Sequence, residues 1–386
     1  MSSRHQVESE GSDSASPDRL VFRIRAWLDG LQSGRFPHID ALRALAVMLV
    51  VVGHAGEAGP GDAGVTVFFA ISGFVITASV LRERERTTGF SIGNFYWRRA
   101  VKLAPPFLVC IAIPTFIAWA LGARFDAVAV FSQIFFSYNW LEIFSSSTAY
   151  DVLPGSSVVW SLAVEEQFYI LFAVGWMLAI RSSRPVFLTA IVSSAVVVLV
   201  AVWRFVLVGT PDGSIHILRG TDTRADAIAG GVLLAIVVHA SWRYPRIRRL
   251  LASPIVFIVA VLVFLATFAV RDETFIQTFR YSIHWVAATV FIAFGVVASR
   301  GRVLALFNWI SRLWAIRLIG LASYSIYLAH NVVGFLLRPI VGDMSGPLLT
   351  IVIASAGTIA GLLIYGVVEV PAQRFKDLVS SRRNPS

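Results

Sequence analysis

The sequence predicts an all-α, polytopic membrane protein with about ten transmembrane helices and both termini in the cytoplasm. Its 386 residues are 56% hydrophobic and only 15% charged, which is not the composition of a water-soluble domain. Ten apolar runs are long enough to cross a bilayer. We expect spans near 39–56, 64–82, 101–122, 159–181, 186–208, 224–241, 253–271, 281–299, 315–338 and 347–369.

The 33 Lys and Arg residues orient these helices. Most of them fall in segments that become cytoplasmic when both ends of the chain are inside. The polar residues 1–35 show no secretory signal and are predicted to form a disordered cytoplasmic tail, 36–375 the membrane domain, and 376–386 a basic cytoplasmic tail. The long connection 123–158 is predicted to stay at the outer face as an interfacial or re-entrant segment, because another full crossing would invert the charge alternation.

Composition also excludes some functions. The net charge of +10 is dispersed over short loops, so the predicted partner is the lipid bilayer and not nucleic acid. The single cysteine, Cys110, cannot form an intrachain disulfide. No metal site and no tightly bound cofactor are expected. The sequence does not indicate the oligomeric state.

The first span carries two ionisable residues inside an apolar helix. Arg43 and His54 are eleven residues apart, so they share one face of a helix at a separation of roughly 16 Å. Such residues in a membrane span usually face the protein interior or a water-filled path. The alternative is that Arg43 extends to the lipid headgroups and His54 caps the outer end of the helix.

A second basic group is predicted at the cytoplasmic side. Arg98, Arg99 and Lys102 lie at the inner end of the third span, and Arg43 lies at the same depth. Guanidinium groups bind phosphate through forked donors, so this group suits a phosphorylated ligand. The alternative is that these residues are ordinary anchors at the inner membrane surface.

Further ionisable residues are predicted in the outer half, near His54. Glu165 and Glu166 point about 100° apart on a helix, so at most one of them faces the cavity of His54, and the sequence does not choose between them. A helix cap with a local ion pair is the alternative for the DTRAD segment, and an interfacial histidine is the alternative for His330. The remaining members of this outer group are Asp222, Arg224, Asp226, Tyr324 and Tyr327.

A neutral histidine can accept a hydroxyl proton, and a nearby carboxylate can fix its tautomer. A basic mouth joined to such a base suggests a path for a long ligand with a phosphate-rich head. An acyl thioester on a phosphopantetheine arm has this shape. We therefore expect Arg43, His54 and one of the two glutamates to line one common tunnel.

Six segments resemble the acyltransferase-3 family of integral membrane acyltransferases. They are FPHIDALRALAVMLVVVGH, FFAISGF, RRAVKLAP, WSLAVEEQFY, DTRADAIAGGVLLA and SYSIYLAH, and the resemblance extends over 36–375. It implies transfer of an acyl group, most often acetyl, from cytoplasmic acyl-coenzyme A to a hydroxyl of a carbohydrate or glycan. It also implies an integral protein of the bacterial inner membrane.

The resemblance places the family's Arg and His pair on Arg43 and His54, and its phosphate-binding pair on Arg99 and Lys102. The chain departs from the family pattern at Lys102, where an arginine is usual, at the Pro105–Pro106 pair, and after His330. The family's small-Gly-Phe element falls on Ser72, Gly73 and Phe74.

The sequence thus predicts an O-acyltransferase with His54 as general base and with Arg43 and Glu165 as the other catalytic residues. Arg98, Arg99, Lys102, Ser72, Gly73 and Phe74 are the predicted donor-binding residues. A secondary transporter of an organic acid or saccharide is the alternative, because intramembrane charges also serve transport. The predicted acceptor-binding residues are Trp160, Glu166, Tyr169, Asp222, Arg224 and His330.

Overall fold

The computed structural model describes residues 36–56, 59–86, 91–342 and 344–383, and these residues form helices and no strand. The predicted disordered tail 1–35 lies outside the described residues. The chain is an all-α, multi-pass membrane protein. Eight helices in the described part are long and apolar enough to cross a membrane, or up to ten when two bent helix pairs each count as one span.

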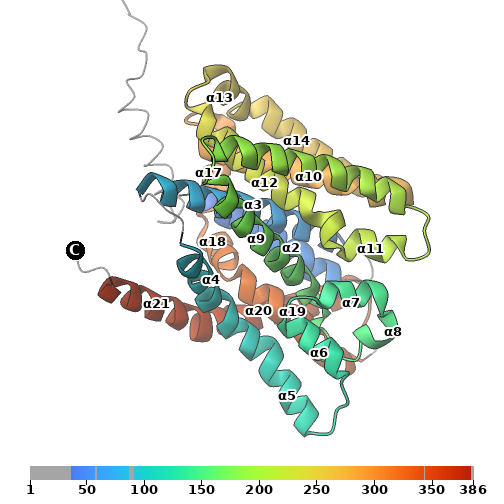
Figure 1. Cartoon of the computed structure of the whole chain (residues 1–386). Coiled ribbons are helices and arrows are strands. Elements are labelled where there is room, and N and C mark those ends of the chain that lie inside the picture. Colours follow the sequence, from blue (N-terminus) through green and yellow to red (C-terminus); the bar gives the residue numbers. More distant parts are fainter. Residues whose placement is uncertain (1–35, 57–58, 87–90, 343, 384–386) are drawn as a thin grey trace, which may run out of the picture.

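The helices run as an elongated bundle in which α3, α9 and α12 lie among their neighbours, with α10 and α14 along one side (Figure 1). The most extensive helix contacts join α3 to α12, α19 to α20, α10 to α12 and α2 to α3. The elements of the first half are α2 (Pro37–Ala55), α3 (Gly61–Arg86), α4 (Ile92–Phe107), η1 (Leu108–Ala112), α5 (Ile113–Ala120), α6 (Ala127–Ile134), α7 (Tyr138–Phe144), α8 (Ser146–Ala149), η2 (Ser156–Val159), α9 (Trp160–Ala179) and α10 (Pro185–Leu207).

The second half of the chain completes the bundle. Its elements are α11 (Gly213–Arg219), α12 (Thr221–Ser241), α13 (Pro245–Leu251), α14 (Pro254–Ala266), η3 (Thr267–Ala269), α15 (Glu273–Phe275), η4 (Ile276–Arg280), α16 (Tyr281–Val297), α17 (Arg302–Arg312), α18 (Trp314–Leu321), α19 (Ser323–Val341), α20 (Gly346–Ile364), η5 (Tyr365–Glu369) and α21 (Val370–Arg383).

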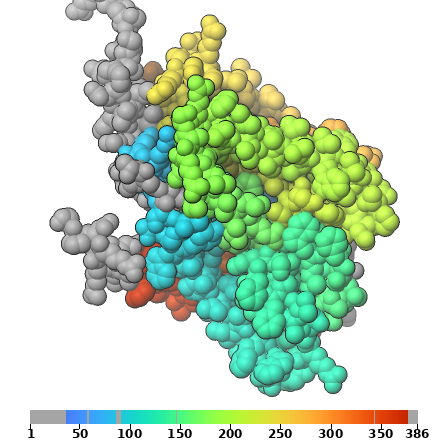
Figure 2. All heavy atoms as spheres, in the orientation of Figure 1, coloured from blue at the N-terminus to red at the C-terminus, as the bar shows by residue number. Residues whose placement is uncertain are grey.

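The connection 123–158 contains no helix long enough to cross a bilayer, as expected. It forms the short helices α6, α7 and α8, which pack as one lobe beside α5 (Figure 2). The lobe places the buried side chain of Glu142 against the end of α11, the helix that follows α10. The connection therefore adds a polar residue to the interior of the membrane domain.

The predicted span 315–338 is divided in the structure. It forms α18 and α19, which meet at Ala322, and α18 itself bends by 67° from α17. A Cβ on Gly320 would lie 2.0 Å from the carbonyl oxygen of Asp40, so α18 and the start of α2 touch through their backbones. The helix α19 then begins as a separate element and carries Tyr324, Tyr327 and His330 into the interior.

Candidate active site

The basic residues that the sequence placed at the cytoplasmic side do converge. They line a cavity of about 370 Å³, here called the inner cavity, between α2, α3, α4, α9 and α19. Glu165 is the acidic residue among its described lining residues. The excess of positive charge suits an anionic ligand. The four cations are Arg43, Arg98, Arg99 and Lys102.

Arg99 is fixed in the wall of this cavity. Its guanidinium is paired with the Glu166 carboxylate, with Nε 3.2 Å from Oε1, and it lies 3.7 Å from the ring centre of Tyr169. The side chains of Arg99 and Glu166 are 22% and 11% exposed. Glu166 and Tyr169 were predicted to bind the acceptor beside His54, but the structure places them around Arg99 instead.

Glu165 also belongs to the inner cavity. Its Oε1 accepts a hydrogen bond from Ser72 Oγ at 3.0 Å, and its Oε2 accepts one from Tyr169 OH at 3.3 Å. The expectation that Glu165 or Glu166 shares a cavity with His54 is therefore wrong. The sequence put these residues at the head of the span, but helical structure already begins at Ser156, so Glu165 lies about 14 Å along the axis from the outer end.

The Ser72–Gly73–Phe74 element does not act as one binding unit. Ser72, a predicted donor-binding residue, lines the inner cavity. Phe74 is fully buried in the core, and a Cβ on Gly73 would lie 1.9 Å from the carbonyl oxygen of Ile228. Gly73 and Phe74 were predicted to contact the donor, but they do not line the inner cavity and instead pack α3 against α12.

His54 lies in a second cavity, here called the outer cavity, of about 530 Å³, which is also lined by Arg219, His330, Asn331 and Arg338. The rings of His54 and His330 are joined by a contact of 3.0 Å between His54 Nδ1 and His330 Nε2. The Nδ1 atom of His330 lies 2.7 Å from the carbonyl oxygen of Tyr327. His330 was predicted to bind the acceptor, with an interfacial histidine as the alternative, and the structure makes it the partner of His54.

These contacts assign the tautomers of both rings. A carbonyl oxygen only accepts, so His330 Nδ1 carries its proton and His330 Nε2 is an acceptor when the ring is neutral. His54 Nδ1 then donates to His330 Nε2. The remaining nitrogen of a neutral His54, Nε2, is left with a lone pair, which a general base requires.

Among the described residues the two cavities are separate and share no lining residue, which differs from the single tunnel expected from the sequence. Tyr327 lies between them, because it lines the inner cavity and its ring centre is 5.8 Å from that of His330. Its hydroxyl contacts Ser161 Oγ at 2.6 Å and donates to the carbonyl oxygen of Val158 at 2.9 Å. Arg43 and His54 thus lie in cavities on opposite sides of a hydrogen-bonded tyrosine.

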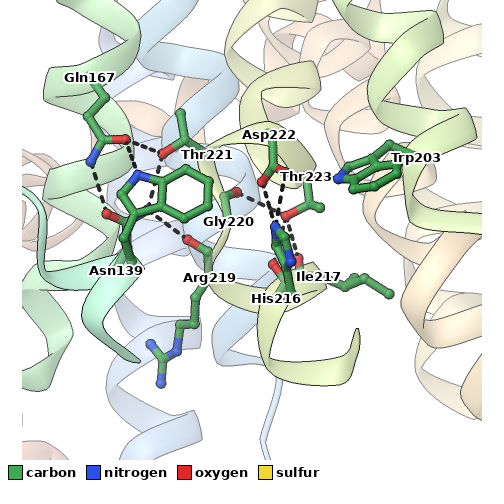
Figure 3. A network of polar contacts seen from close by, with 11 residues as sticks. Asn139, Gln167, Trp203, His216, Ile217, Arg219, Gly220, Thr221, Asp222 and Thr223 are labelled. Atoms are coloured by element: carbon green, nitrogen blue, oxygen red, sulfur yellow. Dashed lines mark hydrogen bonds and ion pairs between the residues drawn. The ribbon is translucent and has the colours of Figure 1, made fainter. Parts of the chain in front are cut away.

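The DTRAD segment has a structural role. Asp222 contacts His216 Nε2 and accepts a hydrogen bond from Trp203 Nε1 at 2.8 Å (Figure 3). Arg224 is buried, donates to Thr66 at 2.7 Å and lies 3.9 Å from the ring centre of Tyr281. Neither residue lines the inner or the outer cavity. The structure therefore favours a structural role over acceptor binding. The predicted cap with a local ion pair is not what it shows, because Gly220 is the N-cap of α12 without a side-chain cap and Asp222 pairs with His216.

Two residues that sequence reasoning missed belong to the outer cavity and its surroundings. Arg219 lines the cavity, and its Nε atom lies 3.5 Å from Oε2 of Glu142, which is fully buried. The guanidinium also lies 4.6 Å from the ring centre of Trp160. Trp160, which was predicted to bind the acceptor, therefore packs its ring against the Arg219 guanidinium. A carboxylate in the apolar stretch 127–144 was the available signal for this arrangement.

Burial raises the pKa of the Glu142 carboxyl from its ordinary value of 4.5 to about 7, and the Arg219 guanidinium opposes part of that shift. A carboxyl whose pKa is raised by folding takes up a proton on folding between these two values. Its contribution to stability is therefore present below pH 4.5 and is lost as the pH rises through about 7.

We expect Glu142→Gln to remove this dependence, because the amide does not titrate. The melting temperature of the variant in detergent, relative to wild type, should rise between about pH 5 and about pH 8. The comparison is made at constant ionic strength. A difference between the two proteins that stays constant over this range contradicts the assignment.

The comparison with protein families identifies the chain. A model of the acyltransferase domain matches residues 36–367, which includes both cavities. The chain belongs to this acyltransferase family. The chain is 28% identical over 359 residues to the peptidoglycan O-acetyltransferase OatA of Listeria monocytogenes. The aligned part covers 88% of this chain and 56% of that relative.

Two other relatives give the same picture. The putative peptidoglycan O-acetyltransferase YrhL of Bacillus subtilis is 28% identical, with 79% of this acyltransferase-family chain and 49% of the relative covered. The O-acetyltransferase OatA of Staphylococcus aureus is also 28% identical, with coverages of 78% and 51%. The chain thus spans about half the length of these relatives. No solved structure matches it.

Proposed function

We propose that the protein is a membrane O-acyltransferase that moves an acetyl group from cytoplasmic acyl-coenzyme A to a hydroxyl of a glycan. Membership of the acyltransferase family supports the reaction class, and the names of the three relatives support a peptidoglycan-like acceptor. A bacterial inner membrane is the proposed location. The family comparison does not favour the transporter alternative.

The hydrogen-bonded pair of His54 and His330 carries this proposal. With His330 as acceptor for His54 Nδ1, the basic nitrogen of His54 is Nε2, in a ring that lines the outer cavity. An acceptor hydroxyl in that cavity can pass its proton to Nε2 as its oxygen bonds to the thioester carbonyl carbon. The carbon–sulfur bond then breaks, and the imidazolium returns the proton to the coenzyme A thiolate.

The inner cavity is the proposed binding site of the donor. Phosphates would contact Arg43 and Lys102, because Arg98 is paired with Glu83 at 3.3 Å and Arg99 with Glu166. Arg43 is held less closely, at 3.8 Å from Asp40. The phosphopantetheine arm would extend toward Tyr327, and that side chain must move before the thioester reaches His54.

The test is an assay of the purified protein in proteoliposomes with acetyl-coenzyme A labelled in the acetyl group. We expect labelled ester on a peptidoglycan-type glycan and one free coenzyme A for each ester formed, both measured by mass spectrometry. The control omits the glycan. Accumulation of unmodified glycan inside the vesicles without acetyl-coenzyme A, and without ester, would support the transporter instead.

A further inference from the structure

The outer cavity has a positive lining that the transfer of an acyl group does not itself require. Arg219 and Arg338 line it together with His54, His330 and Asn331, and none of its described lining residues is acidic. A cleft lined by cations concentrates anions. The charge of this cavity therefore indicates that the group that enters it is anionic.

The backbone of Arg219 is held in place by a polar network. Asn139 Nδ2 donates to the carbonyl oxygen of Arg219 at 3.2 Å and to Thr221 Oγ1 at 3.1 Å. Gln167 Nε2 in turn donates to Asn139 Oδ1 at 2.9 Å, and Gln167 Oε1 accepts from Thr221 at 2.6 Å. Figure 3 shows the Arg219 side chain directed away from this network. Residues of α7, α9 and α12 thus fix the end of α11.

The side chain of Arg219 is supported on one side and is only 18% exposed. Glu142 lies 3.5 Å from Nε, and the face of Trp160 lies 4.6 Å from the guanidinium carbon. No described residue accepts a hydrogen bond from the two terminal nitrogens. A guanidinium held in this way presents the two parallel donors that a carboxylate or phosphate accepts.

We propose that Arg219 binds an anionic group of the acceptor, a carboxylate or a phosphate, in the outer cavity. This inference rests on the proposed function and names the class of its acceptor. The anion would bind to the guanidinium while a hydroxyl of the same molecule lies against His54, so that one contact orients the acceptor for proton transfer. Glu142 and Trp160 act by positioning Arg219.

The anion has two chemical sources. It can belong to the sugar, as a carboxylate, or to a lipid carrier, as a phosphate. The second source is relevant because the outer cavity shares Ala55, Gly56 and Arg338 with a groove of about 990 Å³ along α2 and α20. That groove is lined mainly by apolar side chains, including Met48 and Leu349.

The experiment measures binding without the acyl donor. Three probes are titrated into the detergent-solubilised full chain: a β-1,4-linked N-acetylhexosamine disaccharide with one carboxylate, the methyl amide of that compound, and the neutral disaccharide joined through pyrophosphate to a short polyprenol. We expect the carboxylate or the pyrophosphate probe to bind more tightly than the amide. Whichever does so identifies the source of the anion.

Arg219→Gln should weaken binding of that anionic probe about 10- to 100-fold, the factor expected for a lost charged hydrogen bond, and leave the amide unchanged. Because this change leaves Glu142 buried alone, the double variant Arg219→Gln/Glu142→Gln removes both charges together. Arg124→Gln removes one exposed charge from another loop and should bind all probes as wild type does.

Equal binding of the amide and both anionic probes by wild type overturns the proposal. So does an equal loss for all probes in Arg219→Gln and in the double variant. Charge-selective binding that depends on Arg219 supports it, even where no acyl transfer is detected. In that case the anion site stands and the proposed function fails.

Discussion

Replacing His54 with alanine should lower acyl transfer about 10²- to 10⁴-fold, which is the usual contribution of a positioned general base. The reason is geometric. His54 has a basic Nε2 nitrogen because its Nδ1 atom contacts His330 at 3.0 Å, and its ring lines the outer cavity. The measurement is the rate of labelled ester formation in proteoliposomes, normalised to the amount of inserted protein.

His330 provides the comparison that separates a base from a residue that orients it. His330→Gln should cost less than His54→Ala, because it disturbs the orientation and tautomer of a base that is still present. The double variant His54→Ala/His330→Gln should be no slower than His54→Ala, since residues that act as a unit are not additive. Melting temperatures in detergent check that each variant is folded. Near-normal transfer by His54→Ala would remove the basis of the mechanism.

Much of the fold follows from simple properties of the sequence. Apolar runs of sufficient length and the distribution of Arg between the loops located most of the spans to within a few residues. The predicted helix ends were wrong where a helix extends beyond its apolar run. The helix predicted to begin at 101 starts at Ile92, since Ser91 caps it by accepting a hydrogen bond from the backbone of Asn94 at 3.3 Å.

The site was only partly predictable, because the sequence does not show how each helix is oriented about its own axis. Spacing correctly grouped Arg43 with Arg99 and Lys102, because these residues share one end of the bundle. Spacing could not show that α9 directs Glu165 toward Ser72, or that α19 brings His330 to His54. Such contacts depend on how each helix turns about its axis, which is set by packing across the whole domain.

The contact between Arg219 and Glu142 could not be predicted from the sequence either. In the sequence it is one outer cation among several, and Glu142 precedes it by 77 positions. The two meet because α7 packs against α11, and the burial of Glu142 becomes visible only in that context. A carboxylate inside an apolar stretch indicates that a partner exists, but its identity comes from the fold.

Gly73 offers the sharpest contrast between a role in packing and a role in donor binding. A Cβ on Gly73 would lie 1.9 Å from the carbonyl oxygen of Ile228, and one on Gly231 would lie 2.1 Å from that of Ala70. Small residues of this kind let membrane helices approach through their backbones. Because both obstacles are backbone atoms, α3 and α12 must separate to admit a methyl group.

Gly73→Ala should therefore lower the stability of the folded protein by about 1–3 kcal/mol or more, the usual cost of overpacking a well-packed interior. Gly175→Ala in α9 is the matched control. A Cβ there meets nothing within 4 Å, and replacing a helical glycine with alanine is favourable by roughly 0.5–1 kcal/mol. We expect a lower melting temperature for the first variant and an unchanged or higher one for the second.

The two roles of Gly73 give opposite results in a second measurement. Where Gly73 only packs helices, the fraction of Gly73→Ala that remains folded at low temperature should keep the wild-type KM for acetyl-coenzyme A, with the loss confined to stability. Contact with the donor would instead leave the melting temperature unchanged and raise KM. The second outcome would require α3 to turn its Gly73 face from α12 toward the inner cavity, and the packing described here would be incorrect.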